Sequence, residues 1–124
     1  MEHLVKFPCL AYGSERDWKV LNEKEQNELL AQDDVIREQG ALMAAVEPTA
    51  TTVRAWAGKA VAVEGSFARL DAPLAGFSVI EAADLDEVIR LVANTPCARA
   101  KGAIEIRPIM FINDQEWQRQ RDEE

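Results

Sequence analysis

The sequence predicts an α+β domain in which two helices cover one face of a four-stranded antiparallel sheet, with an additional β-hairpin inserted between the strands. Short apolar runs bounded by glycine and proline alternate with two stretches of helical periodicity. In chain order they give β-α-β-β-β-β-α-β, which is two βαβ units with a hairpin between them. The 124 residues, 48% hydrophobic and 29% charged, suffice for one domain with its own core.

The first strand and first helix are predicted from their boundary residues. The strand covers residues 7–12, with Pro8 at its beginning, where a missing N–H costs little. The helix begins at Asn22, which can form a capping box with Glu25 three residues later. Gly40 can end the helix, because glycine readily adopts the left-handed conformation.

Four further strands and a second helix follow. The strands are predicted at residues 41–46, 51–57, 60–64 and 74–81, with a hairpin turn at Gly58-Lys59. Asp84 caps the second helix, and Glu87 completes a second capping box. Its buried face is predicted to hold Leu85, Val88, Ile89 and Val92. Asn94-Thr95-Pro96 ends this helix, and the last strand covers residues 103–109.

The strand at residues 74–81 is mostly apolar on both sides. If the helices cover one side of the sheet, another surface must cover the second, because an open apolar face favours aggregation. A second copy of the chain is the simplest cover, so the sequence predicts a homodimer.

Charge and composition exclude several classes of protein. The net charge of −8 and pI near 4.7 provide no basic face for nucleic acid or for an anionic membrane surface. No stretch is long and apolar enough to span a membrane, and the N-terminus lacks the pattern of a signal peptide. Cys9 and Cys97 lie far apart and are predicted to be reduced thiols. We therefore expect a cytoplasmic protein.

Several stretches, in order and spacing, resemble the YCII-related family in its DGPF-type branch, over about residues 6–110. The matching stretches are Leu10-Ala11-Tyr12-Gly13 with Trp18, Ala50-Thr51-Thr52-Val53-Arg54, Val63-Glu64-Gly65-Ser66-Phe67-Ala68, Gly76-Phe77, Asp84-Leu85-Asp86-Glu87 and Ile104-Glu105-Ile106-Arg107-Pro108-Ile109. The resemblance implies a ferredoxin-like fold that pairs into a dimeric α/β barrel. Residues 1–124 would then form a single domain of this family, with residues 111–124 as a C-terminal tail.

The resemblance leaves two classes of function open. Relatives in the wider superfamily are proposed to use a His–Asp pair, but the first helix here has no histidine and Asn94-Thr95-Pro96 replaces the expected Asp-Pro. One relative resembles a dehydrochlorinase, which implies a cofactor-independent lyase or isomerase acting on a small anionic molecule in the dimer cleft. Other domains of the family occur beside or fused to sigma factors, which implies a non-catalytic regulatory or interaction module.

The candidate site residues lie at the end of the first strand, at the end of the fourth strand and the loop after it, and on the last strand. The stretch Glu64-Gly65-Ser66-Phe67 lies where the resemblance places the family's Asp-Gly-Pro-Phe motif. Glu64, at the acidic position of this motif, is the candidate general base, unless it only shapes the turn beside Gly65. Arg107 would orient a carboxylate or phenolate with Glu105 beside it, unless these two form a structural salt bridge. Tyr12 and Phe67 would contact the ligand, unless they are packing residues. A shared cavity requires Glu64 and Arg107 to lie within about 12 Å, given the reach of their hydrogen bonds.

The remaining motifs argue against a cofactor. His3 is the only histidine, and no cluster of residues has the spacing of a zinc or calcium site. The chain also lacks a glycine-rich nucleotide loop. We therefore predict neither a metal nor an organic cofactor. At the C-terminus, Asp114 could cap a short helix that docks through Trp117.

Overall fold

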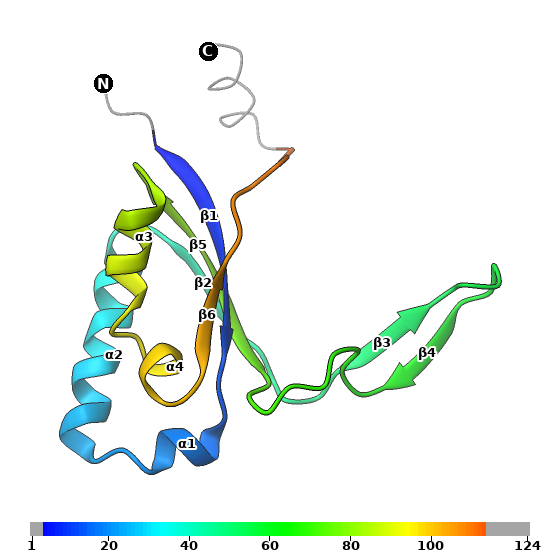
Figure 1. The fold of residues 1–124 in the computed structure, drawn as a ribbon, viewed down its shortest axis with the longest axis horizontal. Coiled ribbons are helices and arrows are strands. Elements are labelled where there is room, and N and C mark those ends of the chain that lie inside the picture. The colour runs from blue at the N-terminus through cyan, green and yellow to red at the C-terminus, as the bar shows by residue number, and fades with distance from the viewer. Residues whose placement is uncertain (1–3, 114–124) are drawn as a thin grey trace.

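The computed structural model describes residues 4–113 as a four-stranded antiparallel sheet with helices on one face (Figure 1). The strand order is β2-β5-β1-β6. The strands are β1 (Val5–Tyr12), β2 (Leu42–Ala45), β5 (Leu74–Ala82) and β6 (Ala103–Ile106). Because a helix follows both β1 and β5, this order is that of a ferredoxin-like fold. The predicted α+β, ferredoxin-like fold of the single chain is confirmed.

Two longer helices, α2 (Glu23–Glu38) and α3 (Leu85–Val92), begin where the capping residues predict. Asn22 and Glu25 form the predicted capping box. Asp84 caps α3, although the Glu87 carboxylate accepts a hydrogen bond from the N–H of Ala83 rather than from that of Asp84.

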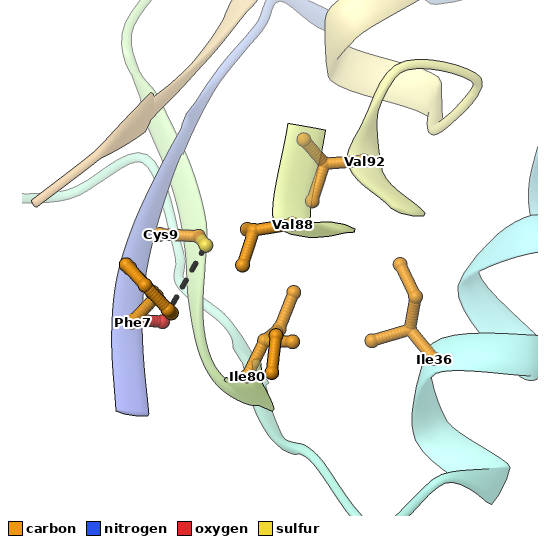
Figure 2. Close-up of a cluster of buried hydrophobic side chains, with 7 residues drawn as sticks. Phe7, Cys9, Ile36, Ile80, Val88 and Val92 are labelled. Carbon is orange, nitrogen blue, oxygen red and sulfur yellow. Dashed lines mark hydrogen bonds between the residues drawn. The ribbon is translucent and has the colours of Figure 1, made fainter. Parts of the chain in front are cut away.

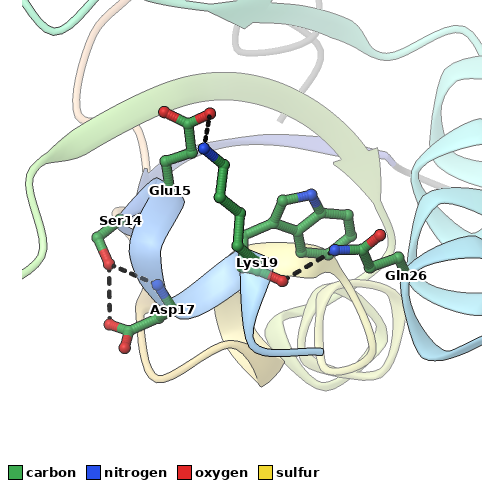
Figure 3. Close-up of polar contacts among 6 residues, drawn as sticks. Ser14, Glu15, Asp17, Lys19 and Gln26 are labelled. Atoms are coloured by element: carbon green, nitrogen blue, oxygen red, sulfur yellow. Dashed lines mark hydrogen bonds and ion pairs between the residues drawn. The ribbon is translucent and has the colours of Figure 1, made fainter. Parts of the chain in front are cut away.

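Two short helices were missed from the sequence. In α1 (Glu15–Lys19) the Ser14 hydroxyl caps the first turn by accepting from the N–H of Asp17 at 3.1 Å (Figure 3). The Gln26 side chain of α2 donates to the carbonyl of Trp18 at 3.0 Å and so ties α1 to α2. Pro96 does not merely end α3, because it opens α4 (Pro96–Arg99) at a first-turn position where its missing N–H is no loss.

Pro8 lies in the interior of β1, not at its beginning as predicted. Within a strand the N–H and C=O of one residue point to the same neighbour. The Pro8 carbonyl accepts from the N–H of Arg107, on the β6 side. Regular pairing between β1 and β6 ends at Cys9 and Ile106, so the missing N–H of Pro8 removes one hydrogen bond at the end of this pairing and leaves the pairing of β1 with β5 intact.

The core lies between the sheet and the two longer helices (Figure 2). Alternate residues of β1 and β5 point to this side, and they meet one side of each helix. The buried cluster consists of Phe7, Cys9, Ile36, Ile80, Ala82, Val88 and Val92. The predicted apolar face of α3 is only half covered, because Leu85 and Ile89 are 44% and 46% exposed.

The opposite side of the sheet carries apolar side chains that none of the helices within residues 4–113 covers. We call this side the open face, and its side chains include Leu10, Leu42, Phe77 and Val79. Phe77 is 39% exposed and Leu42 is 63% exposed.

The inserted hairpin forms its own two-stranded sheet from β3 (Thr51–Arg54) and β4 (Val61–Glu64), which pair with each other. The strand β3 is shorter than predicted, and β6 likewise ends three residues early. We call residues 50–70 the hairpin arm. Figure 1 shows that it projects away from the sheet on the side opposite the helices.

The helices within residues 4–113 are all too short or too polar to cross a membrane. The predictions for His3 and for the C-terminal segment with Asp114 and Trp117 concern residues that lie outside the described part of the chain.

Candidate functional site

A cavity of about 270 Å³ opens between α2, α4 and the sheet, and we call it the helix–sheet cavity. Its wall combines apolar side chains of the core with a small group of polar ones. The polar and sulfur-containing side chains that line it are Cys9, Asp33, Arg37, Ser78, Thr95 and Cys97. A mainly apolar cavity with a few converging polar groups is the usual form of a small-molecule site.

Asp33 and Arg37 lie one turn apart on α2, on the wall of this cavity. Burial raises the pKa of the Asp33 carboxyl, the nearby Arg37 guanidinium lowers it in part, and the charge of Asp34 adds to the rise. Arg37 also pairs with Asp34, with 2.5 Å between Nη1 and Oδ1. The cavity therefore holds a carboxyl group whose proton is held more firmly than usual, next to a fixed positive charge.

The two thiols and a buried hydroxyl complete the polar wall. Thr95 is 5% exposed, and its hydroxyl donates to the carbonyl of Val92 at 2.6 Å. Burial raises the pKa of the Cys9 thiol and of the Cys97 thiol, and the Asp33 carboxylate raises that of Cys97 further. A methyl group at Gly13 would lie 3.0 Å from the Cys97 sulfur, so a residue without a side chain lets α4 sit close to β1.

These raised pKa values predict slow alkylation of both thiols by iodoacetamide, because the thiolate is the reacting form. At pH 7.5 the native protein should react more slowly than the same chain unfolded in urea. The rate for Cys97 should increase when Asp33 is replaced by asparagine, since a nearby negative charge is removed. Mass spectrometry of each labelled peptide measures the two rates, and equal rates in the native and unfolded chains would contradict the prediction.

A second hollow, of about 670 Å³, lies between the hairpin arm and the end of the main sheet, and we call it the arm hollow. Three predicted site residues, Tyr12, Glu64 and Phe67, line it. Two arginines, Arg54 and Arg69, also line it. Phe67 is 74% exposed, so it does not pack into the core of the protomer.

Glu105 and Arg107 lie elsewhere, and they pair with each other. The Arg107 Nε donates to the Glu105 carboxylate at 2.6 Å, which is the salt bridge that the sequence left as an alternative. Neither side chain lines the arm hollow or the helix–sheet cavity. A site shared by Glu64 and Arg107 stays a prediction.

Asp33 was not among the predicted site residues, because the sequence of α2 is mostly polar. The signal was present, since Leu29, Asp33 and Ile36 follow the i, i+4, i+7 spacing of one helix face, and both apolar members are buried. Among residues 4–113, no three side chains of His, Cys, Asp or Glu gather where they could hold a metal ion.

The ferredoxin-like sheet with an inserted hairpin defines an α+β domain protein with a cavity between its helices and its sheet. The YCII-related domain model matches residues 5–118. The chain belongs to the YCII-related family. No curated protein matches the chain closely enough to lend it a function.

Proposed function

We propose that this protein is a homodimer that binds a small, anionic organic molecule, and that it moves a proton on that molecule in a lyase or isomerase reaction that needs no cofactor. The observation that carries the proposal is the position of Asp33, a carboxyl with a raised pKa on the wall of the helix–sheet cavity. Groups with pKa values shifted toward neutrality are effective general acids and bases.

The chemistry divides between two side chains. Arg37 would hold the negatively charged group of the ligand through charged hydrogen bonds. The Asp33 carboxylate would take a proton from a neighbouring carbon. The electron pair of the broken C–H bond then forms a double bond, while a leaving group departs with its own bonding pair. In an isomerase, Asp33 would instead return the proton to another carbon.

The size of the cavity limits the ligand. Its 270 Å³ lies near the lower end of the range for small-molecule sites, which is about 300–1,000 Å³. This favours a small carboxylic acid or phenol over a nucleotide.

A screen of small carboxylates and phenols by thermal shift tests the binding step. Arg37→Met should weaken the binding of the best ligand by about 1.5–3 kcal/mol, the scale of a charged hydrogen bond. Arg90→Met is the matched control, because Arg90 is exposed on α3 and does not line the cavity. Equal losses in both variants would contradict the proposed site.

The open face supports the homodimer part of the proposal. Packing two such faces together would remove Leu10, Phe77 and Val79 from water in a self-complementary contact, well above about 1,000 Å² if the dimer is permanent. A cytoplasmic setting, in which Cys9 and Cys97 stay reduced, belongs to the same proposal and agrees with both thiols being free.

Light scattering after size exclusion should give about twice 13.8 kDa at micromolar concentration. Phe77→Glu should shift the protein toward monomer, because it places a charge in the centre of the open face. A wild-type chain that stays monomeric would contradict the homodimer.

A further inference from the structure

All the large apolar side chains of the hairpin arm are exposed. Each is at least 42% exposed, and they are Val53, Trp56, Val61, Val63, Phe67 and Leu70. Within the described residues β3 and β4 pair only with each other. Because a two-stranded hairpin alone is marginally stable in water, and such exposed apolar surface commonly marks an interface, the arm is suited to contact another chain.

The direction of the arm indicates what that chain is. The arm and the open face lie on the same side of the sheet, opposite the helices (Figure 1). Any body packed on the open face therefore lies beside the arm. The four strand residues Thr51–Arg54 alone reach about 13 Å before the turn, while packed sheets lie about 10 Å apart. The arm is long enough to pass the interface and contact the flank of that body.

Charge favours a second copy as this body. The arm carries Arg54, Lys59 and Arg69 against a single acidic residue, Glu64, whereas the whole chain has a net charge of −8. The rest of the chain is therefore strongly acidic, and a second copy offers that acidic surface to the basic arm. The Arg54 guanidinium lies 4.9 Å from the centre of the Trp56 ring, so the two side chains near the tip are already ordered together.

We propose that the hairpin arm of each protomer packs against the flank of a second copy of this chain seated on the open face, with Trp56 and Arg54 as its main contacts. The inference rests on the proposed homodimer. In a two-fold symmetric pair each chain gives one arm and receives one, so both apolar surfaces are covered at once.

Trp56→Ala and Arg54→Glu test the contact. Trp56 is 83% exposed, so the fold of the protomer should survive its replacement. We expect each variant to raise the dimer dissociation constant about tenfold or more, as buried Trp and Arg anchors do. Val20→Ser is the matched control, because Val20 is 78% exposed in the turn after α1, away from the arm, and should leave the constant unchanged. Sedimentation equilibrium measures all three.

Photocrosslinking identifies what the arm touches. The photoreactive residue p-benzoylphenylalanine replaces Trp56 in a mixture of ¹⁵N-labelled and unlabelled full-length chains. Crosslinks that join position 56 of one isotopic form to peptides outside the hairpin arm of the other form support the proposal. Two outcomes would overturn the arm contact and leave the homodimer in place. The first is a dimer whose dissociation constant is unchanged in both variants and whose crosslinks stay within one chain. The second is a tetramer in which the tips of two arms are crosslinked to each other. A protein that stays monomeric would overturn both.

Discussion

Asp33→Asn is expected to slow proton transfer on a bound ligand by about 10²- to 10⁴-fold, the usual contribution of a positioned acid or base. The exchange of ligand C–H for deuterium in D₂O, followed by NMR, measures this step without knowledge of the leaving group. Binding should survive better than exchange, because Arg37 still holds the anionic group. Glu38→Gln, which alters an exposed carboxylate at the end of α2, is the control and should leave exchange unchanged.

The same variant should make the fold more stable at neutral pH. The pKa of Asp33 is raised in the folded state, so the folded chain holds this proton to higher pH than the unfolded chain does. The stability that the protonated form provides is full below the ordinary value of 3.8, and it is lost as the pH rises through the folded pKa. Melting temperatures should therefore agree between wild type and Asp33→Asn near pH 3 and diverge above it, with the variant higher.

This combination separates a functional carboxylate from a structural one. A gain in stability joined to a loss of exchange means that the cavity keeps a costly charge for its chemistry. A variant that melts lower at pH 7, with exchange intact, would show that Asp33 serves the fold instead.

Ile80→Ala should lower the free energy of unfolding by about 2–5 kcal/mol, the range for a buried isoleucine or leucine cut to alanine. Ile80 is 2% exposed near the end of β5, where it lies opposite Phe7 of β1 on the core side of the sheet. Leu30→Ala is the matched control, because Leu30 is 46% exposed on α2 and should cost far less. Urea unfolding at one fixed protein concentration measures both, since dimerisation makes stability depend on concentration.

Local chemistry made much of the fold predictable. Asn22 and Asp84 carry side chains that accept hydrogen bonds from free N–H groups at the start of a helix. Each of them is the residue directly before the first helical residue, as the sequence predicts. Gly40 follows α2 with a φ of +96°, as its predicted role requires. The errors came where a residue has two possible uses. Pro96 was interpreted as the end of α3 and it opens α4. Pro8 lies inside β1 because its missing N–H faces the end of the pairing with β6, which the sequence does not show.

The candidate site was less predictable, because it depends on which elements meet. Glu64 and Phe67 were chosen from one motif and Tyr12 from the end of the first strand. All three line one hollow, but the cations beside them are Arg54 and Arg69 rather than Arg107. Asp33 and Cys97 are distant in sequence, and only the packing of α4 against α2 and β1 brings them to one cavity. Their shared environment is a property of the tertiary fold, and no local pattern encodes it.

The position of the hairpin arm also bears on how the chain folds. Residues 46–73 separate two strands, β2 and β5, that must pair with each other. The N–H of Gly65 donates to the carbonyl of Ala50 at 2.8 Å, and the Thr52 hydroxyl donates to the carbonyl of Gly65 at 2.6 Å. These bonds close the base of the arm at residues 50–65. The part of the connection between β2 and β5 that is left unpaired is therefore less than half of residues 46–73. Because each halving of a loop saves only about 0.6 kcal/mol of closure entropy, the arm can lengthen or shorten during evolution at little cost to the sheet beneath it.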